Sequence, residues 1–308
     1  MLERLAGNDA LKRELGTALR SGRLPHAVLL VGEPGCGAGF AARCLAADYL
    51  YPAGGPHAEA VLKGEDTECL VLRGEGASGQ IPVKRVREAR EAIQRSALST
   101  DATGRVLFIY GAQNLNGTQG SSANALLKII EEPPEGVLFL LTAPSAAVVL
   151  PTIRSRCAAY TIAPVPVADC AAHLRAERLP AAAAGELAFL YEGHIGTALK
   201  SWNDPPTKAA LGMAKTLCGY AAQGDTYRAL ALLTKYERDK EGFAALLWQL
   251  DQLCSAVLRR PAYGQEQCGG LTPEGAAKIL RADAGVRRSL QGNSNLRLNV
   301  AVLAGALT

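Results

Sequence analysis

The sequence predicts an α/β fold with a parallel sheet, followed by two all-helical domains. In the first half, short apolar runs alternate with segments of helical periodicity, the pattern of a sheet whose strands are joined by crossover helices. A glycine-rich turn follows the first apolar run, and beyond Pro164-Val165-Pro166 the patterns are Ala/Leu-rich and helical. We therefore expect an α/β domain over residues 1–164, a small helical domain over 165–203 and a second helical domain over 204–308.

Five apolar runs are the predicted strands. They cover residues 27–31, 69–72, 106–110, 137–142 and 159–162. A continuous apolar run without alternation is typical of a strand that is buried on both faces. Helical spacing predicts helices over residues 11–21, 41–50, 83–95 and 122–132, and Pro133-Pro134 ends the last of these.

The helical half is less sharply patterned. Residues 246–258 and 296–307 have amphipathic helical spacing. Asn203-Asp204-Pro205-Pro206 has the composition of a linker, and residues 263–271 are predicted to form a loop.

Composition limits the class of protein. Hydrophobic residues make up 48% and charged residues 20% of the 308 residues, as in ordinary folded proteins. No apolar run is long enough to span a bilayer and the N-terminus lacks a signal-peptide pattern, so we expect a cytoplasmic protein. The net charge of +4 permits contact with nucleic acid without demanding it. None of the eight cysteines forms a C-x-x-C pair, so neither a disulfide framework nor a zinc knuckle is expected.

The glycine-rich turn fits part of the P-loop pattern G-x-x-x-x-G-K-[ST]. It reads Gly32-Glu33-Pro34-Gly35-Cys36-Gly37-Ala38-Gly39. Gly32 and Gly37 occupy the two pattern glycines, but Ala38 stands at the lysine position and Gly39 at the Ser/Thr position. Alanine cannot neutralise the phosphates and glycine cannot hold Mg²⁺. Backbone N–H groups can still cradle an anion weakly, and a glycine turn without any ligand is the simpler alternative.

The third predicted strand tests the same site independently. P-loop ATPases end this strand with acids that hold Mg²⁺ and position water. Here the strand continues into Gly111-Ala112-Gln113, without a carboxylate. We therefore expect no ATP hydrolysis at this site and no bound cofactor or metal.

Three segments carry a family resemblance. They are Arg23-Leu24-Pro25-His26-Ala27, then Asn124-Ala125-Leu126-Leu127-Lys128 running on to Glu131-Glu132-Pro133-Pro134, and Thr152-Ile153-Arg154-Ser155-Arg156-Cys157. Together they resemble the AAA+ subunits of bacterial sliding-clamp loaders, and among these the DNA polymerase III subunits with a damaged P-loop. The resemblance covers about the first half strongly and continues weakly to the C-terminus.

The resemblance implies a role for the Ser155-Arg156-Cys157 motif. In clamp loaders of this kind the motif's arginine projects to ATP held by a neighbouring subunit, and a planar, permanently charged guanidinium suits that task. Local sequence alone fits a surface arginine in a turn equally well. Glu131 and Glu132 are unfavourably placed for the dipole of their helix, so either something outside the helix uses them or they form a solvated acidic end.

The chain also departs from the family. Many relatives carry a four-cysteine zinc module after the P-loop helix, but residues 51–60 contain no cysteine, and we expect His57 there to be an exposed loop residue. Gly193-His194-Ile195-Gly196-Thr197-Ala198-Leu199 resembles the family's G-x-x-G-x-A-L turn. Gly196 stands in the region where ATP-binding members place a phosphate-sensing arginine.

These observations favour a non-hydrolysing stator of a clamp loader, not an enzyme by its own residues but part of the DNA polymerase III holoenzyme. The C-terminal helices would form the oligomerisation collar. The expected partners are the ATPase subunits, the clamp-opening subunit and, through the assembly, primer–template DNA, with no membrane. Two alternatives stay open, an active P-loop ATPase of the same family and a stand-alone DNA-binding protein with a vestigial fold.

Overall fold

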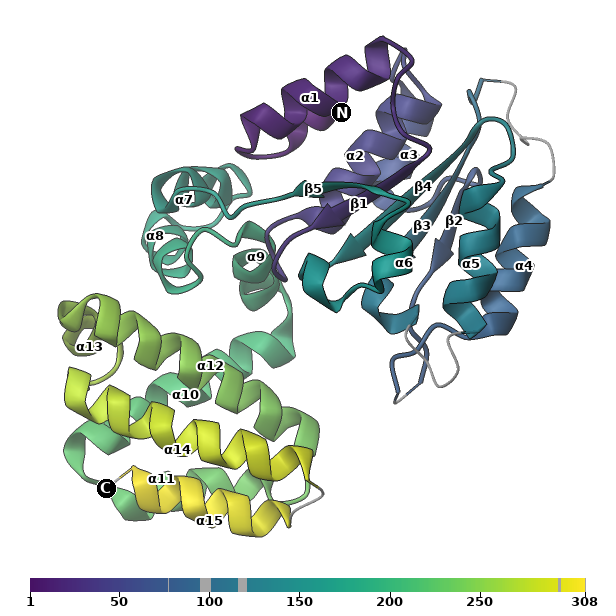
Figure 1. Ribbon diagram of the computed structural model, residues 1–308. Helices are drawn as coiled ribbons and strands as arrows, with labels where there is room; N and C mark the ends of the chain where they lie inside the picture. The colour runs from purple at the N-terminus through teal and green to yellow at the C-terminus, as the bar shows by residue number, and fades with distance from the viewer. Residues whose placement is uncertain (77, 95–100, 116–120, 293–294, 308) are drawn as a thin grey trace. The chain divides into compact units, whose positions relative to one another are not determined.

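The computed structural model describes residues 1–76, 78–94, 101–115, 121–292 and 295–307 (Figure 1). The chain forms two compact units. The first comprises Met1–Leu179 with Glu192–Thr197, and the second comprises Pro180–Tyr191 with Ala198–Thr308. The predicted division into three domains remains a prediction. Among the described helices, none combines the length and apolar character that crossing a bilayer requires.

The first unit is built on a sheet of five strands in the order β2-β3-β4-β1-β5 (Figure 1). The strands are β1 Ala27–Val31, β2 Cys69–Leu72, β3 Arg105–Tyr110, β4 Val137–Ala143 and β5 Ala158–Thr161. Every neighbouring pair is parallel. The predicted fold class is therefore confirmed: a parallel α/β sheet domain with a strand–glycine loop–helix connection, followed by helices. The fifth strand lies one residue earlier than predicted.

Both faces of the central strands are covered. Val28 and Leu30 of β1 pack into the core beneath helices α1, α2 and α3, whereas Leu29 packs into the core beneath α4, α5 and α6. Residues of a strand point alternately to the two faces of a sheet, so burial of both faces requires an unbroken apolar run. This double burial explains why β1, β3 and β4 were readable from sequence.

The helices of the first unit precede, connect or follow the strands in the chain. They are η1 Leu2–Arg4, α1 Asp9–Arg20, α2 Ala38–Leu50, α3 Pro56–Lys63, α4 Val83–Ile93, η2 Ala112–Leu115, α5 Ser121–Glu131, η3 Ala146–Val148, α6 Pro151–Arg154 and α7 Val167–Ala176. The predicted helix over residues 83–95 ends at Ile93, and Arg95 lies outside the described residues. The prediction that His57 is a loop residue was wrong: it lies in α3, where its exposed ring stacks on Tyr51 at 5.3 Å.

The second unit contains helices and no strand among its described residues. Its helices are α8 Ala181–Leu190, α10 Pro205–Gln223, α11 Thr226–Leu233, η4 Thr234–Tyr236, α12 Lys240–Arg259, α13 Pro261–Gln267, α14 Pro273–Gln291 and α15 Leu296–Ala306, together with most of α9 Ile195–Asn203.

Two sequence predictions were wrong in this half. The proposed linker contains the start of α10, because the Asp204 carboxylate accepts from the Thr207 N–H at 3.0 Å and the two prolines occupy the first helical turn. Proline is tolerated there since those N–H groups have no intrahelical acceptor. The predicted loop over 263–271 begins inside α13, where Tyr263 is buried and packs on Phe189 with ring centroids 5.4 Å apart.

Candidate functional site

The glycine loop connects β1 to α2 and lines an open pocket of about 440 Å³. Gly35 and Gly37 have φ values of 94° and 100°, a backbone region that side-chain-bearing residues rarely adopt. All five predicted loop positions line this pocket: Gly32, Gly35, Gly37, Ala38 and Gly39. Gly37 is the N-cap of α2 and offers no side-chain acceptor to the first N–H groups of the helix.

Tyr110 stands at the end of β3, the strand that continues without a carboxylate. The Tyr110 ring stacks on Phe108 with centroids 5.6 Å apart, and the Arg73 guanidinium lies 4.7 Å from its centroid. A Cβ atom on Gly39 would lie 3.3 Å from Cε1 of Tyr110. The edge of the Tyr110 ring therefore lies close to Gly39, which occupies the Ser/Thr position of the P-loop pattern.

The end of β3 is bonded to its neighbouring strand. The Gly111 N–H donates to the Thr142 hydroxyl of β4 at 3.2 Å, and both residues line the pocket. Two buried polar atoms of the pocket residues, Nε of Arg43 and Oε1 of Gln113, have no hydrogen-bond partner within the described part of the chain. Among the described residues that line it, the pocket thus offers one guanidinium and backbone N–H groups, and those that follow β3 supply no carboxylate.

The segment around Gly196 is bonded directly to the glycine loop. The Gly196 N–H donates to the Gly35 carbonyl at 2.9 Å, and the Thr197 hydroxyl donates to the Pro34 carbonyl at 3.1 Å. His194 Nε2 lies 3.2 Å from the Glu33 carboxylate. A Cβ on Gly196 would lie 3.1 Å from the Gly35 carbonyl oxygen, so glycine at 196 permits this close approach.

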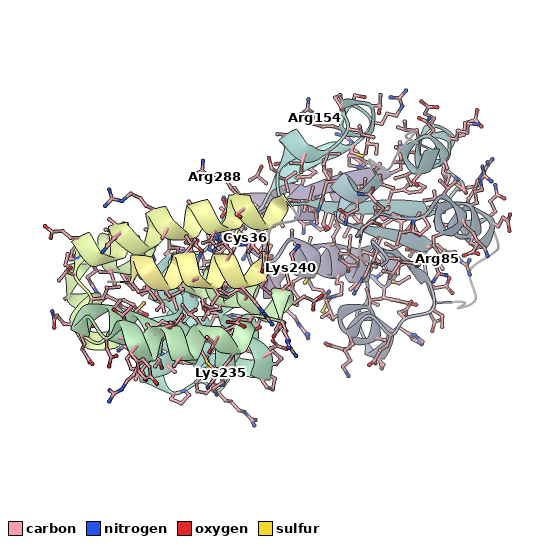
Figure 2. All side chains as sticks on the ribbon, turned by 90° about the horizontal axis from the view of Figure 1, so that it is seen from below. Cys36, Arg85, Arg154, Lys235, Lys240 and Arg288 are labelled. Atoms are coloured by element: carbon pink, nitrogen blue, oxygen red, sulfur yellow. The ribbon has the colours of Figure 1, made fainter. Side chains whose placement is uncertain are left out.

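The Ser155-Arg156-Cys157 turn follows the short helix α6, which Figure 2 marks with the labelled Arg154. The Arg156 side chain is 39% exposed and its Nη2 lies 2.5 Å from Oε1 of Glu131 at the end of α5. Its Nη1 donates to the Thr152 carbonyl at 3.1 Å and to the Ser155 hydroxyl at 3.4 Å. The guanidinium is therefore held at the surface by acceptors from two elements.

The two carboxylates at the end of α5 have different surroundings. Glu131 meets Arg156, a partner outside its own helix, which is one of the two interpretations that its unfavourable position left open. Glu132 is also exposed, and no ion pair is found for it among the described residues.

Cys157 packs against the core beneath α4 and α5. Burial raises the pKa of its thiol to about 11. A thiol with such a pKa stays protonated near neutrality, so Cys157 is suited to packing rather than to nucleophilic chemistry. Ser155 donates its hydroxyl to the Thr152 carbonyl at 3.1 Å, which fixes the same turn.

Sequence reasoning missed Tyr110, Thr142 and Thr197. Tyr110 was visible as an aromatic residue at a strand end that lacks its acid, and Thr197 as a hydroxyl beside the two turn glycines. Neither signal says what the side chain contacts, because both contacts join segments that are distant in sequence. Glu131 and Arg156 were each singled out from the sequence, but their pairing was not predicted.

Comparison with known proteins places these features in a family. A family model described as "DNA polymerase III, delta subunit" matches residues 7–166, just over half of the chain. DNA polymerase III subunit gamma/tau of Mycobacterium tuberculosis is 36% identical over 160 residues, which cover 49% of this chain and 27% of the relative. DNA polymerase III subunit delta' of Escherichia coli is 27% identical over 261 residues, which cover 82% of this chain and 75% of the relative.

The chain thus spans little more than a quarter of the gamma/tau relative's length. Among solved structures, a DNA polymerase III gamma subunit-related protein of Thermotoga maritima aligns at 18% identity, with a TM-score of 0.45 and coverage of 96% of this chain and 99% of that chain. The RuvB Holliday junction branch migration motor of Thermotoga maritima aligns at 17% identity with a TM-score of 0.46, covering 86% of this chain and 83% of that chain.

Proposed function

The chain belongs to the family described as DNA polymerase III, delta subunit, and from this premise we propose that it is a non-hydrolysing stator of a sliding-clamp loader in DNA replication. In this proposal the chain corresponds to the delta' subunit, the printed name of its Escherichia coli relative. It supplies an arginine finger to ATP bound by a neighbouring subunit and does not turn over ATP itself.

The composition of the glycine-loop pocket supports the proposal that the chain does not hydrolyse ATP. Ala38 and Gly39 provide neither the ammonium nor the hydroxyl of a P-loop, and Tyr110 stands where β3 would need an acid. The Gly196 turn is bonded to the loop and carries no sensing arginine. Transfer of a phosphoryl group depends on charge neutralisation and on positioning of the reactants. The ammonium, the hydroxyl, the acid and the sensing arginine would each supply part of these effects.

The single observation that carries the proposed arginine finger is the combination of exposure and bonding at Arg156. Its guanidinium is exposed at a surface turn, yet ordered by Glu131, Thr152 and Ser155. An arginine that acts on another subunit's nucleotide needs both properties, because it must be accessible before assembly and correctly directed after it.

The proposed partners are the ATPase subunits and the clamp-opening subunit of a hetero-oligomer. The helices of the second unit would contribute the collar through which the subunits associate. Contact with primer–template DNA would arise through the assembly, since the net charge of +4 is modest for a protein that grips phosphates alone. The remaining rivals are an active ATPase of this family and a stand-alone DNA-binding protein.

One reconstitution separates these functions. The isolated chain and its mixture with the ATPase subunits are assayed for phosphate release with Mg²⁺-ATP and for complex formation by light scattering. We expect no turnover by the isolated chain and a stable hetero-oligomer in the mixture. Turnover by the chain alone would establish the ATPase alternative, and tight DNA binding without any complex would establish the DNA-binding alternative.

A further inference from the structure

The guanidinium of Arg156 has acceptors of two kinds. Thr152 and Ser155 lie within four residues of it, so they belong to its own turn and bond only Nη1. Glu131 comes from the end of α5, and its Oε1 forms an ion pair with Nη2. Among the described residues, Glu131 is therefore the only acceptor that ties the guanidinium to another element, and the only charged one.

Helix stability does not account for a carboxylate at this position. Glu131 is the last residue of α5, where the carbonyl end of the helix dipole repels a negative charge. The pair is also exposed, at 39% for Arg156 and 46% for Glu131, and exposed ion pairs add little to folding stability. What the contact does provide is a further restraint on a long side chain that is otherwise held only by neutral acceptors of its own turn.

The remaining donors of Arg156 are the ones a phosphate needs. A guanidinium has five N–H groups in a rigid plane. Among the described residues, the hydrogen bonds of Arg156 come from Nη1 and its ion pair with Glu131 involves Nη2, so Nε has no acceptor there and is available for a phosphate oxygen. With Nη1 and Nη2 held, the Nε–H keeps a defined direction, and a charge-assisted hydrogen bond from it to a phosphate oxygen would be strong.

We propose that Glu131 is a positioning residue for Arg156, holding the guanidinium in the orientation in which it meets the phosphates of a neighbour's ATP. This inference rests on the proposed function of Arg156. Glu132 supplies the matched control, because it is the adjacent exposed carboxylate of the same chain segment and has no ion pair among the described residues.

The first measurement uses the isolated chain. Nuclear magnetic resonance of ¹⁵N-labelled arginine follows the Nε–H of Arg156 in the wild type and in Glu131→Gln, Glu131→Ala and Glu132→Gln variants. We expect a clearly lower order parameter in both Glu131 variants and a wild-type value in Glu132→Gln. Equal order in all four proteins would overturn the inference.

The second measurement uses the reconstituted loader with its ATPase subunits and primer–template DNA. With Glu131→Gln we expect kcat to fall about threefold, and with Glu131→Ala about tenfold, while KM for ATP stays within about twofold, since orientation is lost but the finger remains. The Glu131→Ala/Arg156→Ala double variant should be no slower than Arg156→Ala alone, because Glu131 acts through Arg156. Thermal midpoints of the variants verify folding, and Glu131→Gln keeps the test valid if the alanine variant is unstable.

The outcomes separate this inference from the function beneath it. If Arg156→Ala abolishes turnover while the Glu131 variants match Glu132→Gln, the positioning role is wrong and the finger stands. Faster turnover in Glu131→Ala would also overturn the inference, since it would mean that Glu131 holds Arg156 away from the neighbour's ATP. If Arg156→Ala itself has no effect, the proposed function fails and the positioning role fails with it.

Discussion

Gly35 and Thr197 lie in direct contact: a Cβ atom on Gly35 would lie 2.0 Å from the Thr197 hydroxyl oxygen and 2.8 Å from its backbone nitrogen. Two hydrogen bonds join the same segments, from Gly196 N–H to the Gly35 carbonyl and from the Thr197 hydroxyl to the Pro34 carbonyl. The glycine loop is therefore held by protein contacts at a point where only glycine fits.

Replacing Gly35 by alanine should destabilise the fold. The new methyl group meets Thr197 and the residue keeps a φ of 94°, so we expect a loss of about 3 kcal/mol in the free energy of unfolding. Urea denaturation measures it. Gly54→Ala is the matched control, because Gly54 has a φ of 75° and nothing within 4 Å, and should cost only about 1 kcal/mol. Equal losses would show that the contact with Thr197 is not tight.

Restoring the loop side chains should restore binding without hydrolysis. In an Ala38→Lys/Gly39→Ser variant, the ammonium and hydroxyl should raise Mg²⁺-ATP affinity at least about tenfold, since charge-assisted hydrogen bonds are strong. Turnover should stay at the blank level, because the residues that follow β3 still include no carboxylate. Titration calorimetry and phosphate release are the measurements, with Ala38→Gln/Gly39→Ser as the uncharged control. Hydrolysis by the restored variant would mean that the end of β3 is not limiting.

The buried ion pair between Glu68 and Arg105 should matter far more than an exposed one. Glu68 is fully buried, and its Oε2 lies 3.0 Å from Nε of Arg105, which also donates from Nη1 to the Ala92 carbonyl. Glu68→Gln leaves a buried guanidinium without its counter-charge, and we expect a loss of about 3 kcal/mol in unfolding free energy.

The exposed pair between Arg85 and Glu75, at 2.7 Å, is the control for that experiment. Glu75→Gln should change the unfolding free energy by less than about 1 kcal/mol, because solvent screens the pair. A similar loss in both variants would remove burial as the cause.

Cys157 should behave as a packing residue. Burial raises its thiol pKa to about 11, so the reactive thiolate is present below that pKa only as a small fraction, about one in a thousand at pH 8. Alkylation of the folded protein, followed by mass spectrometry, should therefore be slow at pH 8 and accelerate as the pH rises toward 11. Cys157→Ala should leave the neighbour's ATPase rate within about twofold, since it removes only packing atoms. Rapid labelling of Cys157 at pH 7 would contradict this.

Burial decided how much of the fold could be predicted. Strands β1, β3 and β4 were readable because both of their faces are covered, so nearly all of their residues are apolar. The start of α10 was misread because Pro205-Pro206 has the same local composition in a linker as in a first helical turn, and only the bond from Thr207 N–H to Asp204 distinguishes the two.

The candidate site, too, could be predicted only in part from the sequence. The missing lysine, hydroxyl and acid were visible as residue types at known spacings. The contact between Arg156 and Glu131 was not, because 25 positions separate them and no periodicity links α5 to the turn after α6. Nor was the edge of Tyr110 against Gly39, which depends on how β3 meets α2.

The most direct test of the central claim compares Arg156→Ala with Arg154→Ala in the reconstituted loader. Arg154 lies two residues earlier and donates to the Ala146 carbonyl at 3.3 Å, so it controls for loss of a nearby arginine. The measurement is DNA-stimulated ATP turnover at equal complex concentration. The account predicts intact assembly in both variants, a fall in kcat of about 10³-fold for Arg156→Ala, and less than about a twofold change for Arg154→Ala. Unchanged turnover in the fully assembled Arg156→Ala complex would contradict it.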